Sequence, residues 1–347
     1  MKYLGIDVHT DATVWCLLDE AGTQLGTGRT KTSSLALCEL ATELGKDGDL
    51  VVGQEVGTQV YLVHDAIRAA GVPVLSFNAA HLRIIAASRK KTDRRDAYWI
   101  AKSLQTGMTP HVVYVPYGEV RELRRLLARR SLLKRDLKRW QVRARALLRA
   151  HGHRVRPGGH YINKLVAELL ERIEGLDTDV VESLGMCERF IDMLREEVAH
   201  VDALLAVRTE NNDVITRLQT IPGIGPVASA TIYATVGEIG RFRNARMLAA
   251  YAGLVPSVRQ SGDSNQLGRI TKEGSKPLRS TLVQCAHVVS RTSSDDAAPL
   301  RAHFDRIRGT RGRRKIALVA LARNLLRVAF HVWKDGTPYD ARRLTTD

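Results

Sequence analysis

The chain has 347 residues, 44% of them hydrophobic, so it is long enough for two or three folded domains and too apolar for wholesale disorder. Its 53 Lys and Arg against 37 Asp and Glu give a formal net charge of +16. Such an excess favours a polyanionic partner, and a merely well-solvated surface is the plainer alternative. No apolar stretch approaches the roughly 20 residues of a membrane helix, and no lipidation motif is present, so no membrane partner is expected.

The amino-terminal third alternates between short β-rich runs and helical patterns. Their order, βββ-α-β-α-β-α, is that of an α/β ribonuclease H-like domain, a mixed sheet covered by helices, which we place at residues 1–110. Ser33 or Ser34 is the predicted cap of the first helix. The predicted strands are 3–8, 12–18, 24–30, 50–56 and 72–77, and the predicted helices are 35–47, 58–70 and 93–104.

Residues 111–210 are predicted to form a helical linker. Apolar residues recur every three, four or seven positions over 118–156, and the other faces of that helix are strongly basic. A solvated coiled-coil face normally alternates in sign, so we favour a phosphate-contacting helix over a plain coiled coil. Two further helices, 162–173 and 180–208, are expected to return as a hairpin used for spacing or oligomerisation. The cations proposed to bind nucleic acid on the long helix are Arg121, Arg124, Arg125, Arg129, Lys134, Arg135, Lys138, Arg139 and Arg143.

Residues 211–340 are predicted to form a third, mainly α-helical domain. The segment Ile221-Pro-Gly-Ile-Gly-Pro is typical of a helix-hairpin-helix element, whose backbone N–H groups can hold a DNA phosphate. A tight turn that only packs two helices against each other is an equally open interpretation. An amphipathic helix is expected at 315–333.

Four acids carry the chemical signal of the first domain. Asp7 and Glu55 end two strands that are expected to be parallel neighbours, and Asp93 and Asp96 share one helix face. Two carboxylates about 4 Å apart repel by roughly 4 kcal/mol at an effective dielectric of 20, so such a cluster needs cations. Mg²⁺ prefers oxygen ligands, and two such ions can serve the nucleophile and the leaving oxygen of a phosphodiester.

Sugar kinases and actin-like ATPases offer a rival interpretation, because they also open with a Gly-Ile-Asp strand. They need a glycine-rich phosphate loop directly after it, and here that turn reads Val8-His9-Thr10-Asp11. A basic helix also has no role in a small-molecule kinase. Nucleic-acid chemistry is therefore favoured.

Ser261 is a second candidate for chemistry. It lies in a stretch expected to be flexible, near Arg259, Arg269 and Lys272, cations that can hold a scissile phosphate in line. Most Ser-Gly pairs are turns, and Ser257 is nearly as plausible a nucleophile by spacing alone. The residues by themselves leave this choice open.

Several segments resemble the DEDD-type transposases of bacterial insertion sequences, in the right order along nearly the whole chain. The amino-terminal matches are Gly5-Ile-Asp, Gln54-Glu-Val-Gly-Thr and Lys91-Thr-Asp-Arg-Arg-Asp-Ala-Tyr-Trp-Ile-Ala. The carboxy-terminal matches are Ile221-Pro-Gly-Ile-Gly-Pro, Tyr251-Ala-Gly-Leu-Val-Pro, Gln260-Ser-Gly, Gly268-Arg-Ile-Thr-Lys-Glu-Gly and Pro277-Leu-Arg.

The resemblance implies a first domain similar to Holliday-junction resolvases, with Mg²⁺ held by the four acids. It also implies that the serine of the Ser-Gly pair attacks DNA and forms a phosphoserine link, which favours Ser261 over Ser257. Active sites in this family combine residues of different subunits, so a dimer or tetramer joined by the middle helices is expected. Family members are guided by a structured RNA that pairs with donor and target DNA.

The sequence therefore predicts a Mg²⁺-dependent, RNA-guided DNA transposase or recombinase, located in the bacterial cytoplasm at the nucleoid. One alternative is a structure-specific endonuclease, such as a junction resolvase, that uses water as the nucleophile. The other is a nucleic-acid-binding protein with a degenerate site. The four widely spaced cysteines fit a reducing compartment.

Overall fold

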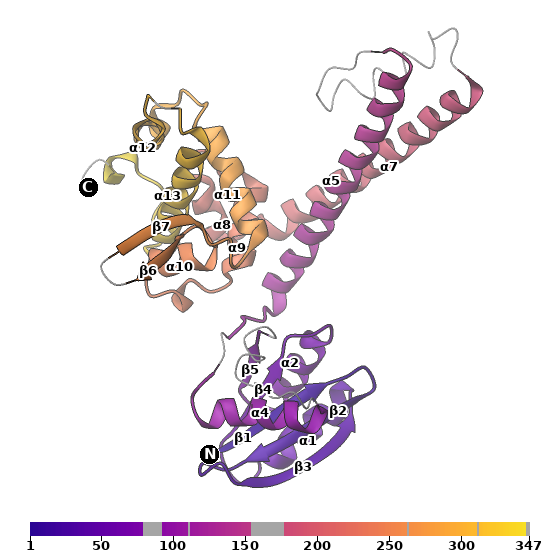
Figure 1. The fold of residues 1–347 in the computed structure, drawn as a ribbon, viewed down its shortest axis with the longest axis vertical. Coiled ribbons are helices and arrows are strands. Elements are labelled where there is room, and N and C mark those ends of the chain that lie inside the picture. Colours follow the sequence, from indigo (N-terminus) through magenta and orange to yellow (C-terminus); the bar gives the residue numbers. More distant parts are fainter. Residues whose placement is uncertain (79–91, 110–111, 154–176, 262–263, 311, 345–347) are drawn as a thin grey trace. The chain divides into compact units, whose positions relative to one another are not determined.

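The computed structural model describes residues 1–78, 92–109, 112–153, 177–261, 264–310 and 312–344, with the backbone alone at 258–261, 264–267 and 344. The chain divides into two compact units, Met1–Pro116 and Tyr117–Asp347 (Figure 1). The predicted helix at 162–173 lies outside the described residues. The predicted boundaries near 110 and 210 stay predictions.

The first unit is built on a five-stranded mixed sheet of order β3-β2-β1-β4-β5. The central strand β1 is antiparallel to β2 and parallel to β4, as the sequence predicted. This α/β arrangement is compatible with a ribonuclease H-like domain. The elements are β1 (Lys2–Val8), β2 (Ala12–Leu18), β3 (Gln24–Lys31), α1 (Ser34–Gly45), β4 (Leu50–Glu55), α2 (Val60–Ala69), β5 (Val74–Phe77) and α4 (Asp93–Gln105).

Helices cover the two faces of this sheet differently. Leu4 and Ile6 of β1 pack with α1 and α2, whereas α4 packs with Cys16 and Leu18 of β2 and with Phe77 of β5. Side chains alternate between the two faces of a strand, so the odd-numbered residues of β1 face α4. The face of β1 that carries Asp7 is therefore the face that α4 covers.

The second unit begins with two long helices, α5 (Gly118–Ala150) and α7 (Thr178–Thr209), which lie side by side (Figure 1). Leu137, Ala144 and Leu148 of α5 pack against Leu184 and Ile191 of α7, among others. The apolar spacing that predicted a long amphipathic helix thus describes the seam of this pair.

A helical bundle completes the second unit, with α13 at its centre. Ten residues of α13 are buried, and its core includes Leu218, Leu248, Leu282 and Phe304 from neighbouring helices. The bundle consists of α8 (Asp213–Gln219), α9 (Pro226–Val236), α10 (Ala245–Tyr251), α11 (Lys276–Val289), α12 (Ala298–Arg308) and α13 (Arg314–Lys334), with short 3-10 turns at Ile239–Arg241, Asp295–Ala297 and Ala341–Leu344.

The burial of α13 decides how its apolar composition is interpreted. By length and composition alone α13 could cross a membrane, contrary to the expectation that no stretch is long and apolar enough. More than half of its most apolar window, 56%, is buried inside the protein. Its apolar side chains are therefore accounted for by the core of the bundle.

The segment between α8 and α9 is a tight turn joining two helices, which is the arrangement common to both interpretations of the sequence. Gly223 has φ +80°, and a Cβ there would lie 2.9 Å from the carbonyl oxygen of Cys285 in α11. The glycine is thus needed for packing of the turn against α11. Packing against α11 therefore explains why residue 223 is a glycine. A contact between this turn and a DNA phosphate stays a prediction.

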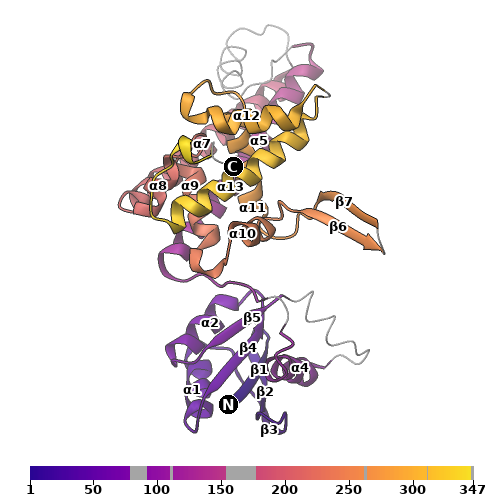
Figure 2. The same cartoon turned by 90° about the vertical axis from the view of Figure 1, so that its left-hand side faces the viewer.

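A two-stranded ribbon, β6 (Pro256–Ser261) and β7 (Ser264–Ile270), extends from the bundle (Figure 2). The sequence had indicated a flexible stretch at 259–262, whereas the structure assigns the part of it up to Ser261 to a β-strand, and Gly262 lies outside the described residues. The strands are antiparallel, and Ser261 pairs with Ser264 across the last register position. The two residues between them in sequence are Gly-Asp, a composition typical of a hairpin connection. The sequence therefore contained a signal for a β-hairpin at this place.

Candidate active site

Two glycines, Gly5 and Gly53, allow α4 to lie directly on the sheet. They are opposite each other in the parallel strands β1 and β4. A Cβ on Gly5 would lie 2.0 Å from the carbonyl oxygen of Ala97 and 2.4 Å from the amide nitrogen of Ala101. A Cβ on Gly53 would lie 2.8 Å from Cγ2 of Ile100. A side chain at Gly5 would push the helix backbone away, and one at Gly53 would displace the side chains that pack on it.

This close approach brings the first turn of α4 to the end of β1. Asp93 opens α4 one turn before Ala97, and Asp7 is the penultimate residue of β1. The Nε2 atom of His9 lies 3.1 Å from Oδ2 of Asp7 and 3.4 Å from Oδ2 of Asp93. One ligand-type atom from each of the three residues lies within 4.8 Å of the others. We refer to Asp7, His9 and Asp93 as the acid–histidine cluster.

The loop carrying His9 is fixed by hydrogen bonds. Its amide donates to the carbonyl of Ala12 (3.2 Å), and the Thr32 hydroxyl donates to the carbonyl of His9 (2.8 Å). Gln59, just before α2, donates its side-chain amide to the carbonyl of Thr10 (3.2 Å). The backbone that presents the imidazole is therefore positioned by three different elements of the unit.

The remaining two predicted acids lie beside the cluster. Ile6 pairs with Gln54 in the parallel register, so Glu55 is next to Asp7 on the neighbouring strand. Asp96 lies in the first turn of α4 and acts electrostatically on Asp7. The fold thus brings all four predicted acids to the same end of the β1–β4 pair.

Burial and charge together perturb Asp7, whose side chain is 17% exposed. Burial raises its pKa, the charges of Asp96 and Asp93 raise it further, and His9 lowers it. Both burial and neighbouring carboxylates disfavour the ionised form. A cation among these carboxylates would remove the repulsion.

The donor set fits a divalent metal ion. Carboxylate oxygens are the ligands that Mg²⁺ and Mn²⁺ share, and an imidazole nitrogen suits Mn²⁺ better than Mg²⁺. His9 is the member of this cluster that sequence reasoning did not include. The only signal for it was its place two residues after Asp7 in the turn that replaces a glycine-rich loop.

Two of the basic residues expected to contact phosphates, Arg121 and Arg124, are instead buried or hydrogen-bonded within the second unit. Arg121 is 8% exposed. Arg124 donates from Nε to the carbonyl of Ala234 (2.6 Å) and from Nη2 to that of Thr235 (2.8 Å), at the end of α9. A cation that satisfies terminal carbonyls stabilises the helix end. We therefore leave Arg121 and Arg124 out of any nucleic-acid surface.

Acids of α7 neutralise part of α5. Arg129 pairs with Glu197 at 2.6 Å, and Arg130 pairs with Asp202 through two hydrogen bonds. The basic face of α5 is therefore less uniformly positive in the fold than in the sequence.

The cations further along α5 face solvent. Lys134 and Lys138 are exposed, and Arg135 and Arg139, whose side chains are 60% and 69% exposed, share Asp136. Arg125 is also exposed, and Arg143 lies over the ring of Trp140 at 4.7 Å. This part of α5 keeps the positive surface that the sequence indicated.

The β6–β7 ribbon separates the two candidate serines. Ser257 is near the base, where a Cβ on Gly268 would lie 2.4 Å from its Oγ. Ser261 is the last residue of β6. Arg259 is on the same strand as both serines, while Arg269 and Lys272 lie at and just after the end of β7. The two units carry the acids and the serines separately.

A mixed α/β unit with clustered acids, joined to a basic helical unit, is the construction of a nucleic-acid-processing enzyme. Comparison with known families makes this specific. A model of the DEDD transposases of IS110 matches residues 4–152, and one described as transposase IS116/IS110/IS902 family matches residues 215–301. The chain belongs to the IS110/IS116 family of transposases and is a DNA transposase or recombinase.

Individual relatives agree with this assignment. The chain is 27% identical over 295 residues to the transposase for insertion sequence element IS1111A of Coxiella burnetii, covering 84% of this chain and 78% of the relative. It is 30% identical to the transposase for IS1328 of Yersinia enterocolitica, covering 53% of this chain and 54% of the relative. It is 33% identical to the pilin gene-inverting protein of Moraxella bovis, covering 40% and 42%.

Proposed function

We propose that this protein cuts and rejoins DNA at specific sites through a transient covalent bond between Ser261 and a DNA phosphate. In this proposal Asp7, Glu55, Asp93 and Asp96 hold Mg²⁺. The observation that carries the proposal is the convergence of the acids at the end of β1, where α4 lies on Gly5 and Gly53. Carboxylates held this close are unfavourable unless a cation or a proton joins them.

Bound Mg²⁺ would polarise a phosphoryl oxygen and stabilise the charge that develops on it. The chain's own residues position that chemistry. Asp7 and Glu55 are fixed by adjacent strands, and Asp93 by the helix end. His9, 3.1 Å from Asp7 and 3.4 Å from Asp93, limits how far those carboxylates can separate.

The serine step conserves the number of phosphoester bonds. The Ser261 oxygen forms a bond to phosphorus while the bond from phosphorus to one deoxyribose oxygen breaks, and the hydroxyl proton ends on the released oxygen. Reversal with a different DNA end rejoins the strand without an external energy source. A position at the end of a strand ribbon, away from the bundle, supports this role for Ser261 (Figure 2).

Donor and target DNA are the proposed substrates, and a structured RNA is the proposed guide. The net charge of +16 and the exposed cations of α5, such as Lys134 and Lys138, support a polyanionic partner. A homo-oligomer, a dimer or tetramer, is proposed because the family's sites combine residues of different subunits. The guide and the assembly follow from the family resemblance.

The test is a denaturing-gel assay for a protein–DNA adduct. The purified protein, with any RNA that accompanies it, is mixed with labelled donor and target DNA, with and without Mg²⁺. We expect an adduct with the unmodified protein that is absent from Ser261→Ala and from Asp7→Ala. Ser257→Ala is the matched control, because it removes the other candidate hydroxyl of the same ribbon, and it should keep the adduct.

Two results would change the proposal. Cleavage without an adduct, unaffected by Ser261→Ala, would assign the protein to the endonucleases that use water. Binding without any Mg²⁺-dependent cleavage would leave a nucleic-acid-binding protein with a degenerate site.

A further inference from the structure

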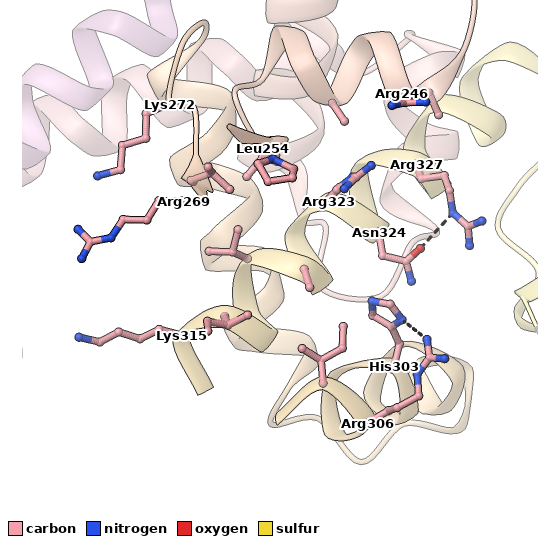
Figure 3. Close-up of a pocket in the computed structure, with 18 of the residues that line it drawn as sticks. Arg246, Leu254, Arg269, Lys272, His303, Arg306, Lys315, Arg323, Asn324 and Arg327 are labelled. Atoms are coloured by element: carbon pink, nitrogen blue, oxygen red, sulfur yellow. Dashed lines mark hydrogen bonds between the residues drawn. The ribbon is translucent and has the colours of Figure 1, made fainter. Parts of the chain in front are cut away.

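The second unit contains a cavity of about 1370 Å³ that neither the acids nor Ser261 belong to. It lies between α10, α12, α13 and the base of the β6–β7 ribbon (Figure 3). Its volume exceeds what a single small metabolite needs, since pockets for such ligands measure about 300–1,000 Å³. The cavity is therefore large enough for an extended or polymeric ligand.

The lining of this cavity is basic. Among the residues that the structure describes there, seven are Arg or Lys and none is Asp or Glu. In Figure 3, Arg269, Lys272 and Lys315 extend at one end and Arg246 and Arg327 lie at the other. The basic residues are Arg246, Arg269, Lys272, Arg306, Lys315, Arg323 and Arg327. We call these seven the basic rim.

The basic rim surrounds one further titratable side chain, His303 of α12. Arg306 lies with Nη2 3.2 Å from Nδ1 of His303. Burial lowers the pKa of His303, and the charges of Arg306 and Arg327 lower it further. Arg306 of α12 and Arg327 of α13 therefore both act electrostatically on His303. An anion in the cavity would reduce their mutual repulsion.

Most of the other residues that line the cavity are apolar, and we call them the apolar floor. It combines small and branched side chains from α10, α12, α13 and the ribbon, without an acid among the described residues. A phosphate backbone alone makes no use of such a surface. The faces of bases and sugars do, but only where the strand is not base-paired in a duplex. The floor residues are Ala245, Ala249, Leu254, Pro256, Ile270, Pro299, Ala302, Ile307, Ile316, Val319 and Ala320.

The ribbon connects this cavity to Ser261. Pro256, Gly268, Arg269 and Ile270, at the base of the ribbon, line the cavity, and Ser261 ends the strand that begins at Pro256. Five residues of extended strand span about 17 Å. That length corresponds to about five stacked nucleotides at 3.4 Å each. A nucleic-acid strand bound in the cavity could therefore reach Ser261 within about five nucleotides.

We infer that the cavity binds a single-stranded segment of nucleic acid a few nucleotides from the phosphate that Ser261 attacks. Phosphates lie on the basic rim, and unpaired bases or sugars lie on the apolar floor. The charge of the rim selects a polyanion, and the floor distinguishes an unpaired strand from a duplex. This inference rests on the proposed role of Ser261 for its place in the reaction, although binding itself does not require it.

The test is fluorescence anisotropy with the full-length protein and no divalent ion, using labelled dT12, U12 and an abasic 12-nucleotide strand. Removing one cation that binds a phosphate should lower the salt slope by about 0.7 and the affinity at 0.1 M salt by about five-fold. We expect those decreases for Arg246→Ala and for Arg323→Ala, and a decrease in affinity of about 25-fold for both together. Arg291→Ala, an exposed arginine of the same unit outside the lining, is the matched control and should change neither.

The floor has its own test. The abasic strand should bind the unmodified protein more weakly than dT12 at the same salt slope. Ala320→Phe, which adds bulk inside the cavity without changing charge, should weaken dT12 and U12 and leave the abasic strand unchanged. Thermal unfolding followed by circular dichroism verifies that each variant folds.

Equal binding of dT12 by the Arg246→Ala/Arg323→Ala protein and the unmodified protein would overturn the inference. Weaker binding by Arg291→Ala as well would show a general charge effect and also overturn it. The binding assay is repeated with Ser261→Ala, which should bind dT12 normally. If the adduct assay fails while this binding persists, the fault lies in the proposed function and not in the cavity.

Discussion

Gly5 and Gly53 face each other across two parallel strands, and α4 rests on both, with its backbone on Gly5 and the side chains of Ile100 and Leu104 on Gly53. That contact sets the distance between the end of β1 and the first turn of α4. The acids of the candidate site are held on those two elements. The geometry of the site therefore depends on residues that carry no chemistry themselves.

Replacing Gly5 with alanine should disrupt the acid–histidine cluster. The new Cβ would meet the carbonyl oxygen of Ala97 at 2.0 Å, so α4 must move away and take Asp93 with it. We expect a loss of about 1–3 kcal/mol in the free energy of unfolding, together with weaker divalent-ion binding. Urea unfolding and isothermal titration calorimetry measure the two effects. Gly26→Ala, whose Cβ would meet only the Trp15 ring at 3.4 Å, is the control and should keep both properties.

Mg²⁺ should stabilise the first unit in a pH-dependent way. The pKa of Asp7 is raised in the folded state by burial and by Asp96 and Asp93. Without metal, the contribution of this carboxyl to stability is present below its unfolded pKa and is lost as pH rises through the folded value. Metal binding needs the ionised form, so the increase in Tm caused by Mg²⁺ should be large at neutral pH and vanish as pH falls through the raised pKa.

Asp7→Asn is the matching variant for that experiment. It keeps the size of the side chain and removes the titration and the charge. The increase in Tm with Mg²⁺ should be much smaller in this variant and nearly independent of pH. An unchanged increase would mean that Mg²⁺ binds elsewhere.

Removing the imidazole of His9 should change Asp7 directly. His9 lowers the pKa of Asp7, against the raising effect of burial. In His9→Ala we expect the pKa of Asp7 to rise further, which NMR titration of the carboxyl carbon measures. If His9 also ligates the ion, Mn²⁺ affinity should fall more than Mg²⁺ affinity, because imidazole suits Mn²⁺ better. Equal decreases for both ions would restrict His9 to an electrostatic role.

The cations of α5 should fall into two groups on mutation. Arg130→Ala breaks the two hydrogen bonds to Asp202 of α7 and should lower stability, with little change in the salt slope of nucleic-acid binding. Lys138→Ala removes an exposed charge and should lower that slope by about 0.7–0.9 with unchanged stability. Chemical unfolding and salt-titrated binding on the same two proteins test the division. A reversed pattern would contradict it.

Alkaline pH should destabilise the second unit through Cys285. Burial raises the pKa of this thiol from 9.0 to about 11, so the folded state keeps the proton that the unfolded state has lost. The stability that this group contributes is complete below pH 9 and should fall by about 1.4 kcal/mol per pH unit between pH 9 and 11. Cys285→Ala should lack this part of the pH dependence. The comparison of the two urea-unfolding series isolates the thiol from the other groups that titrate there.

Much of the fold could be predicted because local periodicity reports which side of an element is buried. The apolar run 50–56 predicted the strand that the structure gives as β4, and the spacing of Leu137, Trp140 and Ala144 predicted the helix whose apolar side packs against α7. Ser33 is the cap of α1, as one of two predicted candidates, and its side chain accepts from the amide of Ala36. The ribbon was not predicted, because residues 259–262 were interpreted as a flexible stretch and the Ser-Gly pair as a common turn.

The sequence by itself determined the order of the elements, the positions of the four acids and the basic character of α5, since each depends on residues close together in the chain. Only the tertiary structure decided which charges are neutralised and which remain. Glu197 and Asp202 of α7 neutralise arginines of α5, His9 enters the acid cluster, and the basic rim gathers from three helices and a ribbon. Electrostatic interactions depend on distance in space, and pairs separated by tens of residues acquire that distance only when the chain folds.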